Sequence, residues 1–295
     1  MLYSKYLKKR YYRIIESLIK KILIYKNNSK NITLLKAIRS AIYYTTGKNE
    51  ILFSNNKDIK YLLGSRDWIS LKLFIDKDFD YSILKKAIKL VGRNHSKSTL
   101  INIGAHIGST CIPAIKENKF KNSIVFEPTK KTFKLLQSNI FLNGVDDKIK
   151  AYNLAISNKK TKLHLAIKKG NIGGNYISTN KKNTEIVKSD ILDNYTYNLN
   201  KNNTLIFMDV EGHEPNIFLG ARKTIKKKIP IVFEFYPSLL NKNWIKKFDI
   251  VFKNYKFFYD LRGKCKKQKF NKKNLIALID KVNLIEGKHT DLLII

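Results

Sequence analysis

One glycine-containing segment, residues 99–128, constrains the fold of this chain more than any other. It reads TLINIGAHIGSTCIPAIKENKFKNSIVFEP. The order of apolar strand, glycine turn, helix and second apolar strand predicts a βαβ unit. Such a unit places backbone amides and a helix N-terminus beside Gly104 and Gly108, with the carboxylate of Glu127 across the crevice. This arrangement suits a cofactor that carries an adenosine group.

The glycine turn discriminates between two classes of adenosine cofactor. Dinucleotide sites use the pattern G-x-G-x-x-G, in which the second glycine lets the backbone approach a pyrophosphate. That position is His106 here. S-adenosylmethionine has no phosphate, and the two oxygens of Glu127, roughly 20 residues beyond Gly104, could accept both ribose hydroxyls. We therefore expect S-adenosylmethionine. His106 is either a turn histidine bonded to backbone or a cofactor contact, and Asn102 brings a hydrogen-bond acceptor without charge.

A second group of ionisable residues follows another buried strand, at the strand end where doubly wound sheets bind ligands. Asp209, Glu211, His213 and Glu214 fall within six residues, a density that core packing does not explain. A helix N-terminus, which favours acidic residues, accounts for Glu214 alone. Glu234 interrupts the apolar run of the next strand. The sequence leaves open whether Glu234 reaches the cleft or forms a buried ion pair.

Strand and helix patterns alternate with short connections, which predicts an α/β fold with a doubly wound, mostly parallel sheet. We expect strands at 99–103, 123–127, 149–156, 204–208 and 229–235, and helices at 79–91, 109–118, 129–142 and near 214–227. Residues 1–50 would be a basic helical extension. Residues 51–295 would be one domain, with a motif core at about 95–236 and a tail at 237–295 that completes the sheet or caps the acceptor.

The charge of the chain is strongly positive, with 58 Lys and Arg against 23 Asp and Glu, a formal net charge of +35. Such a charge suggests a nucleic-acid partner. However, nearly all of it is lysine spread along the whole chain, whereas sites that read base sequence favour the bidentate fork of arginine. We expect no specific nucleic-acid partner, although the surface should attract anionic membranes, sugars or nucleotides at low salt.

The first 45 residues are basic, and apolar side chains recur in them at helical spacing. This helix packs on the main domain or on a partner subunit, or it lies on a membrane surface. Its charges are scattered among the apolar residues, which is untypical of a signal peptide. Two cysteines are too few for a disulfide framework. No apolar run reaches the 18 residues that would indicate a membrane-spanning helix. We expect a cytoplasmic protein, with peripheral membrane contact as an alternative. The sequence does not give the oligomeric state.

Several separated motifs carry a resemblance to one family. NIGAHIG, VFEP with KTFKLLQSNIFLNG, AYNLAIS, ILDNY, MDVEGHEPNIFLGA and PIVFEF have the order and spacing of the FkbM-type methyltransferases. Over about residues 60–236 the chain resembles these Rossmann-like, class I enzymes, which use S-adenosylmethionine and mostly O-methylate sugars, glycolipids or secondary metabolites. The resemblance implies that Gly104, Ala105 and Gly108 form the cofactor turn and that Glu127 binds the ribose. This chain departs from the family pattern at Asn102 and His106, where the family usually carries Asp and Asn, respectively.

The resemblance implies an O-methyltransferase whose acceptor is a small molecule or a glycan. Methyl transfer from a sulfonium requires alignment of the acceptor oxygen and removal of its proton. Asp209 or His213 would be the base, or Asp209 and Glu211 would hold a divalent metal such as magnesium that acidifies the hydroxyl. Glu234 is a further catalytic candidate. A nucleic-acid methyltransferase and a non-catalytic binding domain, which lost the donor through Asn102, stay open.

Overall fold

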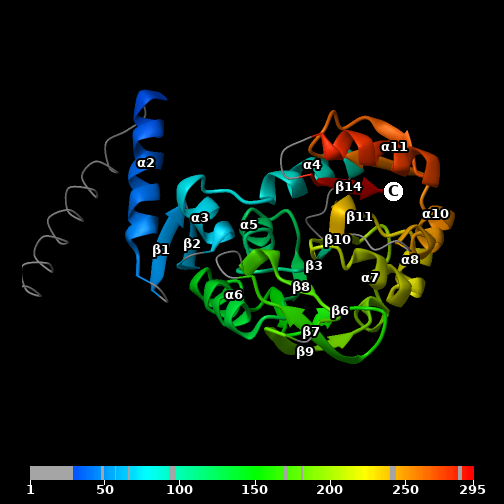
Figure 1. Ribbon diagram of the computed structural model, residues 1–295, viewed down its shortest axis with the longest axis horizontal. Coiled ribbons are helices and arrows are strands. Elements are labelled where there is room, and N and C mark those ends of the chain that lie inside the picture. The colour runs from blue at the N-terminus through cyan, green and yellow to red at the C-terminus, as the bar shows by residue number, and fades with distance from the viewer. Residues whose placement is uncertain are drawn as a thin grey trace, which may run out of the picture.

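The computed structural model describes residues 29–47, 50–56, 58–65, 67–92, 98–168, 172–180, 182–239, 244–284 and 288–295. An eight-stranded sheet with the order β13-β12-β14-β11-β10-β3-β4-β5 forms its centre (Figure 1). The strands are β3 (Thr99–Ile103), β4 (Asn122–Phe126), β5 (Ile149–Tyr152), β10 (Thr204–Met208), β11 (Ile231–Phe235), β12 (Phe257–Asp260), β13 (Lys267–Lys269) and β14 (Thr290–Ile294). Strands β5, β4, β3, β10 and β11 are parallel, and β14 runs antiparallel between β11 and β12. The predicted doubly wound, mostly parallel sheet is confirmed.

The central strands read as continuous apolar runs because helices bury both faces of the sheet. Side chains alternate between the faces, so Leu100 and Ile101 of β3 enter different cores. One core packs against α4 (Tyr81–Val91), α5 (Cys111–Lys116) and α6 (Lys130–Leu142). The other packs against α7 (Glu214–Gly220), α8 (Arg222–Lys226), α9 (Trp244–Lys247), α10 (Asp249–Asn254) and α11 (Lys272–Asn283). The residues after β3, β4 and β10 therefore meet at one edge of the sheet.

A second, four-stranded sheet covers that edge, and the sequence did not predict it. Its order is β6-β9-β7-β8, with the bounds β6 (Ala155–Ile156), β7 (Thr161–Ala166), β8 (Tyr176–Ile177) and β9 (Thr184–Asp190). The single strand predicted at 149–156 is wrong, because the chain leaves the first sheet after Tyr152. There Asn153 turns its amide onto the carbonyl oxygens of Glu127 and Pro128, both at 2.9 Å, and the chain enters the second sheet.

The single helix predicted near 214–227 is also wrong. It divides into α7 and α8, because α7 ends at Gly220 and Ala221 is both the C-cap of α7 and the N-cap of α8. A Cβ at Gly220 would lie 2.2 Å from the carbonyl oxygen of Ser157, so the end of α7 packs directly on backbone. The carboxylate of Asp193 accepts the backbone N–H groups of Lys223 and Thr224 at 2.9 and 2.8 Å, which satisfies the first turn of α8.

An N-terminal unit lies at one side of the main sheet (Figure 1). It consists of α2 (Ser29–Thr45), the hairpin of β1 (Ile51–Asn56) and β2 (Ile59–Gly64), and α3 (Trp68–Ile75). Two asparagines attach it, Asn139 in α6 and Asn143 at the C-cap of that helix. Asn139 pairs with the backbone N–H and carbonyl of Leu62, and Asn143 with those of Lys60, at 2.7–3.2 Å. Asn139 also donates to the carbonyl of Ile107 at 3.0 Å, so the hairpin is bonded to the turn after β3. The amphipathic face predicted before Ser29 lies outside the described residues.

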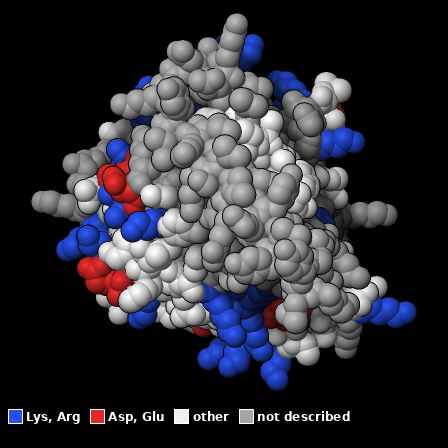
Figure 2. Space-filling model, turned by 90° about the vertical axis from the view of Figure 1, so that its left-hand side faces the viewer, with Lys and Arg blue, Asp and Glu red and all other residues white. Residues whose placement is uncertain are grey.

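The described surface carries the positive charge that the composition predicts. Figure 2 shows Lys and Arg side chains gathered along the lower edge of the face that bears the N-terminal unit, with Asp and Glu in smaller groups. Among the helices within the described ranges, none combines the length and the apolar character needed to cross a bilayer.

Candidate functional site

A cavity of about 650 Å³, part of it open to solvent, lies at the carboxyl ends of the parallel strands. It brings together six residues that the sequence singled out: Gly104, His106, Glu127, Asp209, Glu211 and His213. These residues come from three loops that are far apart in the chain, after β3, β4 and β10. The tertiary structure therefore joins the glycine turn and the acidic segment, which the sequence treated as separate features, into one site.

The glycine turn is held between its two neighbouring strands. Gly104 has φ +78°, and a Cβ there would lie 1.9 Å from the carbonyl oxygen of Asp209, so no other residue fits. The backbone N–H groups of Gly104 and Ala105 donate to the carbonyl of Phe126 at 3.0 and 2.9 Å, and the N–H of Asp209 donates to the carbonyl of Ile103 at 3.0 Å. This close packing fixes the turn against the first residue of the acidic segment.

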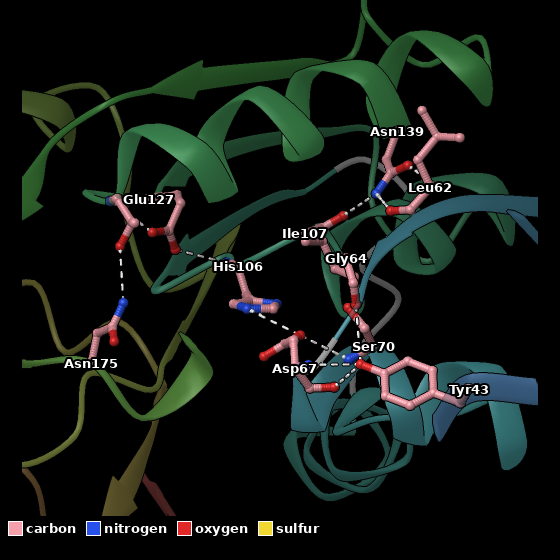
Figure 3. Close-up of polar contacts among 11 residues, drawn as sticks. Tyr43, Leu62, Gly64, Asp67, Ser70, His106, Ile107, Glu127, Asn139 and Asn175 are labelled. Carbon is pink, nitrogen blue, oxygen red and sulfur yellow. Dashed lines mark hydrogen bonds and ion pairs between the residues drawn. The ribbon is translucent and has the colours of Figure 1, made fainter. Parts of the chain in front are cut away.

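Glu127 follows β4 directly and is only 6% exposed. One of its carboxylate oxygens accepts the backbone N–H of Thr129 at 2.8 Å, and the other accepts that of His106 at 3.1 Å (Figure 3). Burial raises the pKa of Glu127, while His106 and these hydrogen bonds act in the opposite direction. The side chain of Thr129 also hydrogen-bonds to Glu127, and the lone pairs that remain on the carboxylate are available to hydroxyl groups of a ligand.

Apolar side chains close the rest of this cavity, and sequence reasoning missed them. They come from the junction of the two sheets and from the second sheet: Leu154, Ala155, Ile156, Leu165 and Ile177. The motif AYNLAIS contains the first three, but the prediction of one strand at 149–156 hid their position beside the cofactor turn. An apolar wall near a carboxylate that can bind ribose suits a purine ring.

The acidic turn after β10 owes its shape to two residues in the left-handed region, Glu211 with φ +52° and Gly212 with φ +86°. Glu214 is 1% exposed and accepts the backbone N–H of Val210 at 3.1 Å, which closes the turn. Burial raises the pKa of Glu214 to about 8. Glu214 therefore stabilises the loop at the start of α7 and is not on the wall of the cavity.

A second cavity of about 1340 Å³ adjoins the first and shares Asp209 and Glu211 with it. Its six carboxylate residues are Asp76, Asp78, Asp80, Asp209, Glu211 and Glu234, and its basic residues are Lys72, Lys168, Arg262 and His289. Asp76 pairs with Lys36 and Lys72, and Asp80 pairs with Arg262. Asp209 and Glu211 lie on the wall that the two cavities share.

Three carboxylates, those of Asp209, Glu211 and Glu234, gather at that boundary. One oxygen from each lies within 4.8 Å of the others. Burial raises the pKa of all three, and the neighbouring carboxylates raise those of Asp209 and Glu234 further. The Oε2 atom of Glu234 is buried without a hydrogen-bond partner among the described residues, and its Oε1 atom is 3.9 Å from Nε2 of His289. Glu234 thus lines the cavity beside the acidic turn.

His213 has both ring nitrogens engaged. Lys247 donates to Oδ1 of Asn216 at 2.8 Å, which directs the amide nitrogen of Asn216 to Nδ1 of His213 at 3.0 Å. Nδ1 is therefore the acceptor, and Nε2 carries the proton toward the hydroxyl of Ser157 at 2.9 Å. Burial and the charge of Lys247 lower the pKa of His213 to about 4, so the ring is neutral at pH 7.

The other predicted cofactor residues lie behind the turn, not on the walls of the two cavities. Asn102 is 1% exposed, its Nδ2 atom is 3.5 Å from the carbonyl of Phe207, and its Oδ1 atom has no partner within the described ranges. Gly108 has φ +92° and begins the helical segment through its carbonyl, which accepts the N–H of Ile112 at 3.1 Å. Ala105 is buried. These residues support the shape of the turn.

A protein family and several solved structures are similar to this chain. A family model described as a methyltransferase FkbM domain matches residues 102–270. Among solved structures, TYW2 of Pyrococcus horikoshii in complex with MeSAdo is 16% identical, with 84% of this chain and 71% of that chain covered and a TM-score of 0.37. TYW2 of M. jannaschii in complex with AdoMet is 12% identical, with 84% and 86% covered and a TM-score of 0.40. The StiE O-MT structure is 10% identical, with 76% and 74% covered and a TM-score of 0.39.

A search of curated proteins finds no match. The family model alone spans more than half of the chain and includes the glycine turn, Glu127 and the acidic segment. The protein therefore belongs to the FkbM family and is a methyltransferase that uses S-adenosylmethionine.

Proposed function

We propose that this enzyme transfers the methyl group of S-adenosylmethionine to a hydroxyl oxygen of a small molecule or glycan, such as a sugar, a glycolipid or a secondary metabolite. The observation that supports this proposal is the position of Asp209, which lines both cavities. A group at that boundary can contact a donor in one cavity and an acceptor in the other. In-line displacement at the sulfonium requires such an arrangement.

The first cavity would hold the donor. Glu127 would accept the two ribose hydroxyls, the apolar wall at Leu154–Ile156 would contact the purine, and the turn at Gly104 would lie beside the amino-acid end. Gly104 leaves the backbone accessible there because it has no side chain. Asn102 takes no direct part in this arrangement, which is why its departure from the family pattern does not remove the donor site.

The second cavity would hold the acceptor, with Asp209 as the general base. Burial and the neighbouring carboxylates raise the pKa of Asp209, which makes its carboxylate a stronger base toward the proton of a hydroxyl. His213 is a weaker candidate, because its acceptor nitrogen is already bonded to Asn216. The charged residues that line this cavity are acidic as well as basic, so it is not the basic groove that a phosphate backbone requires, which favours a small molecule or glycan over nucleic acid despite the basic surface.

A divalent cation is a second way to activate the acceptor. Asp209, Glu211 and Glu234 offer the hard oxygen ligands that magnesium prefers, and the unpartnered oxygen of Glu234 fits this set. When bound, the ion would supply a Lewis acid that lowers the pKa of the acceptor hydroxyl. Turnover measured with EDTA and then with added magnesium distinguishes the two schemes, because a carboxylate base alone keeps its activity in EDTA.

The proposal is tested by transfer of a labelled methyl group from S-adenosylmethionine to a panel of saccharides, glycolipids and tRNA. We expect alkali-stable methyl ethers on a hydroxyl-bearing acceptor and no transfer to tRNA. Asp209→Asn should remove this transfer. Asp193→Asn, which changes a carboxylate outside both cavities, should keep it. Preferential methylation of tRNA would contradict the proposal. Sedimentation with anionic vesicles at physiological salt would test peripheral membrane contact separately.

A further inference from the structure

Two buried polar side chains from distant parts of the chain, Asp67 and His106, face each other beside the donor cavity (Figure 3). The side chain of Asp67 is 3% exposed and that of His106 is 10% exposed. Nε2 of His106 is 3.7 Å from Oδ2 of Asp67, which is longer than a hydrogen bond but within ion-pair distance. His106 lines the donor cavity, whereas Asp67 belongs to the N-terminal unit and lies outside the matched family domain.

The hydrogen bonding of this pair is incomplete. Nδ1 of His106 and Oδ1 of Asp67 are both buried, and neither has a partner in the described part of the chain. Buried polar atoms are normally bonded, and Nδ1 of His106, whose residue lines the donor cavity, is available to a bound ligand. Hydrogen bonds at active sites often shorten only when the substrate binds. A bound donor could supply a partner for Nδ1 and bring the ring closer to Asp67.

Asp67 is a rigid anchor because its own backbone is fixed. The hydroxyl of Tyr43, from α2, accepts the N–H of Asp67 at 2.7 Å and donates to its carbonyl at 2.5 Å. Oδ2 of Asp67 accepts the N–H of Ser70 at 2.9 Å and so caps α3. Ile69 of the same helix lines the donor cavity. The N-terminal unit therefore supplies part of the wall and a fixed carboxylate behind His106.

His106 in turn contacts Glu127, the residue whose carboxylate would bind the ribose. Its φ of +49° is unfavourable for a residue with a side chain, so neighbouring contacts must hold it. Its backbone N–H donates to Oε2 of Glu127 at 3.1 Å. A shift of the His106 ring would move this N–H, and the orientation of the Glu127 carboxylate would change with it.

We propose that Asp67 is a positioning residue for the donor: it holds His106, and through it the glycine turn, in the conformation that binds S-adenosylmethionine. The N-terminal unit then completes the donor site of the FkbM domain. This inference rests on the donor site placed above in the first cavity.

Binding of S-adenosylhomocysteine, measured by calorimetry, tests the proposal through a double-mutant cycle. Asp67→Asn keeps an oxygen that can cap α3 but removes the charge. We expect about tenfold weaker binding in Asp67→Asn and in His106→Ala. We also expect Asp67→Asn to have no further effect when His106→Ala is already present, because Asp67 acts through His106. A purely structural role of Asp67 as a helix cap predicts the same loss in both backgrounds.

The matched control is a substitution between amide and carboxylate at another helix N-cap, far from the donor site. Asn271 caps α11 by accepting the N–H of Asn274 at 2.9 Å, and Asn271→Asp should leave donor affinity unchanged. A second comparison avoids any change at Asp67. His106→Gln keeps an amide nitrogen near the position of Nε2, whereas His106→Asn keeps one only near Nδ1. We expect the Gln variant to bind the donor more tightly, although Asn adopts positive φ more readily.

Normal binding by a folded Asp67→Asn protein would overturn the proposal, and so would a full effect of Asp67→Asn in the His106→Ala background. Equal or tighter binding by His106→Asn than by His106→Gln would also overturn it. Failure of the wild-type protein to bind S-adenosylhomocysteine would refute the donor site itself, together with everything that depends on it. This last result is distinct from the others because it does not involve a variant.

Discussion

Glu127→Gln is the substitution that tests the donor site most directly. Both oxygens of the native carboxylate accept backbone N–H groups, from Thr129 at 2.8 Å and His106 at 3.1 Å. The amide has only one oxygen, so its NH₂ group must face one of these N–H groups, donor against donor. The variant therefore loses a hydrogen bond to a charged group, one oxygen for a ribose hydroxyl, and the orientation that the pair of bonds provides.

Loss of a hydrogen bond to a charged group costs roughly 1.5–3 kcal/mol, which corresponds to donor binding about 10- to 150-fold weaker. Calorimetry with S-adenosylhomocysteine measures this change, and thermal unfolding verifies that the variant is folded. Glu185→Gln is the matched control, since Glu185 also accepts a backbone N–H, that of Lys130 at 3.2 Å, but is not on the cavity wall. Donor affinity in Glu127→Gln equal to that of the control would remove Glu127 from the site.

Asp209→Asn should reduce single-turnover methyl transfer by roughly 10²–10⁴-fold while donor binding survives, and near-normal turnover would exclude Asp209 as the base. Gly104→Ala should not yield a native fold, because its Cβ would lie 1.9 Å from the carbonyl oxygen of Asp209; a thermal unfolding curve like that of wild type would contradict this. Asn102→Asp should lower Tm, since it buries a carboxylate against the carbonyl of Phe207, and an unchanged Tm would show that the side chain is solvated. The folded pKa of Glu214, about 8, is above its usual value of 4.5, so folded protein binds the extra proton and stability falls as pH rises through this window. Glu214→Gln should weaken that fall between about pH 5 and 8, and parallel pH profiles of Tm would refute it.

The pattern of residues along the chain was sufficient to predict the central sheet. Strand β3 and strand β10 lie where the sequence placed them, because a strand buried on both faces is mostly apolar and so forms a recognisable run. Gly104 and Glu127 could be identified as a pair because the βαβ unit fixes their relation locally. The same local order carried the resemblance to the FkbM family.

Tertiary contacts decided which of the predicted site residues reach the ligand cavities. Asn102 lies in β3 and His106 in the turn four residues later, yet the first is buried beside the carbonyl of Phe207 and the second lines the donor cavity. The hydrogen bonds that Asn216 and Lys247 direct to His213 likewise depend on tertiary contacts. The same is true of the position of Glu234 beside Asp209, because no local sequence pattern relates these segments.

The second sheet and the N-terminal unit show most clearly which features depend on tertiary contacts. The pattern of residues predicted the elements that are fully buried and have local contacts, and hence the core of the fold and part of the site, but not the apolar wall at Leu154, Leu165 and Ile177. Only the tertiary structure placed Asp67 against His106, and Asn139 against Leu62, because these contacts depend on side-chain hydrogen bonds between segments separated by tens of residues. Such bonds leave no periodic signal in the sequence, since a single buried amide or carboxylate can satisfy a backbone group anywhere within its reach.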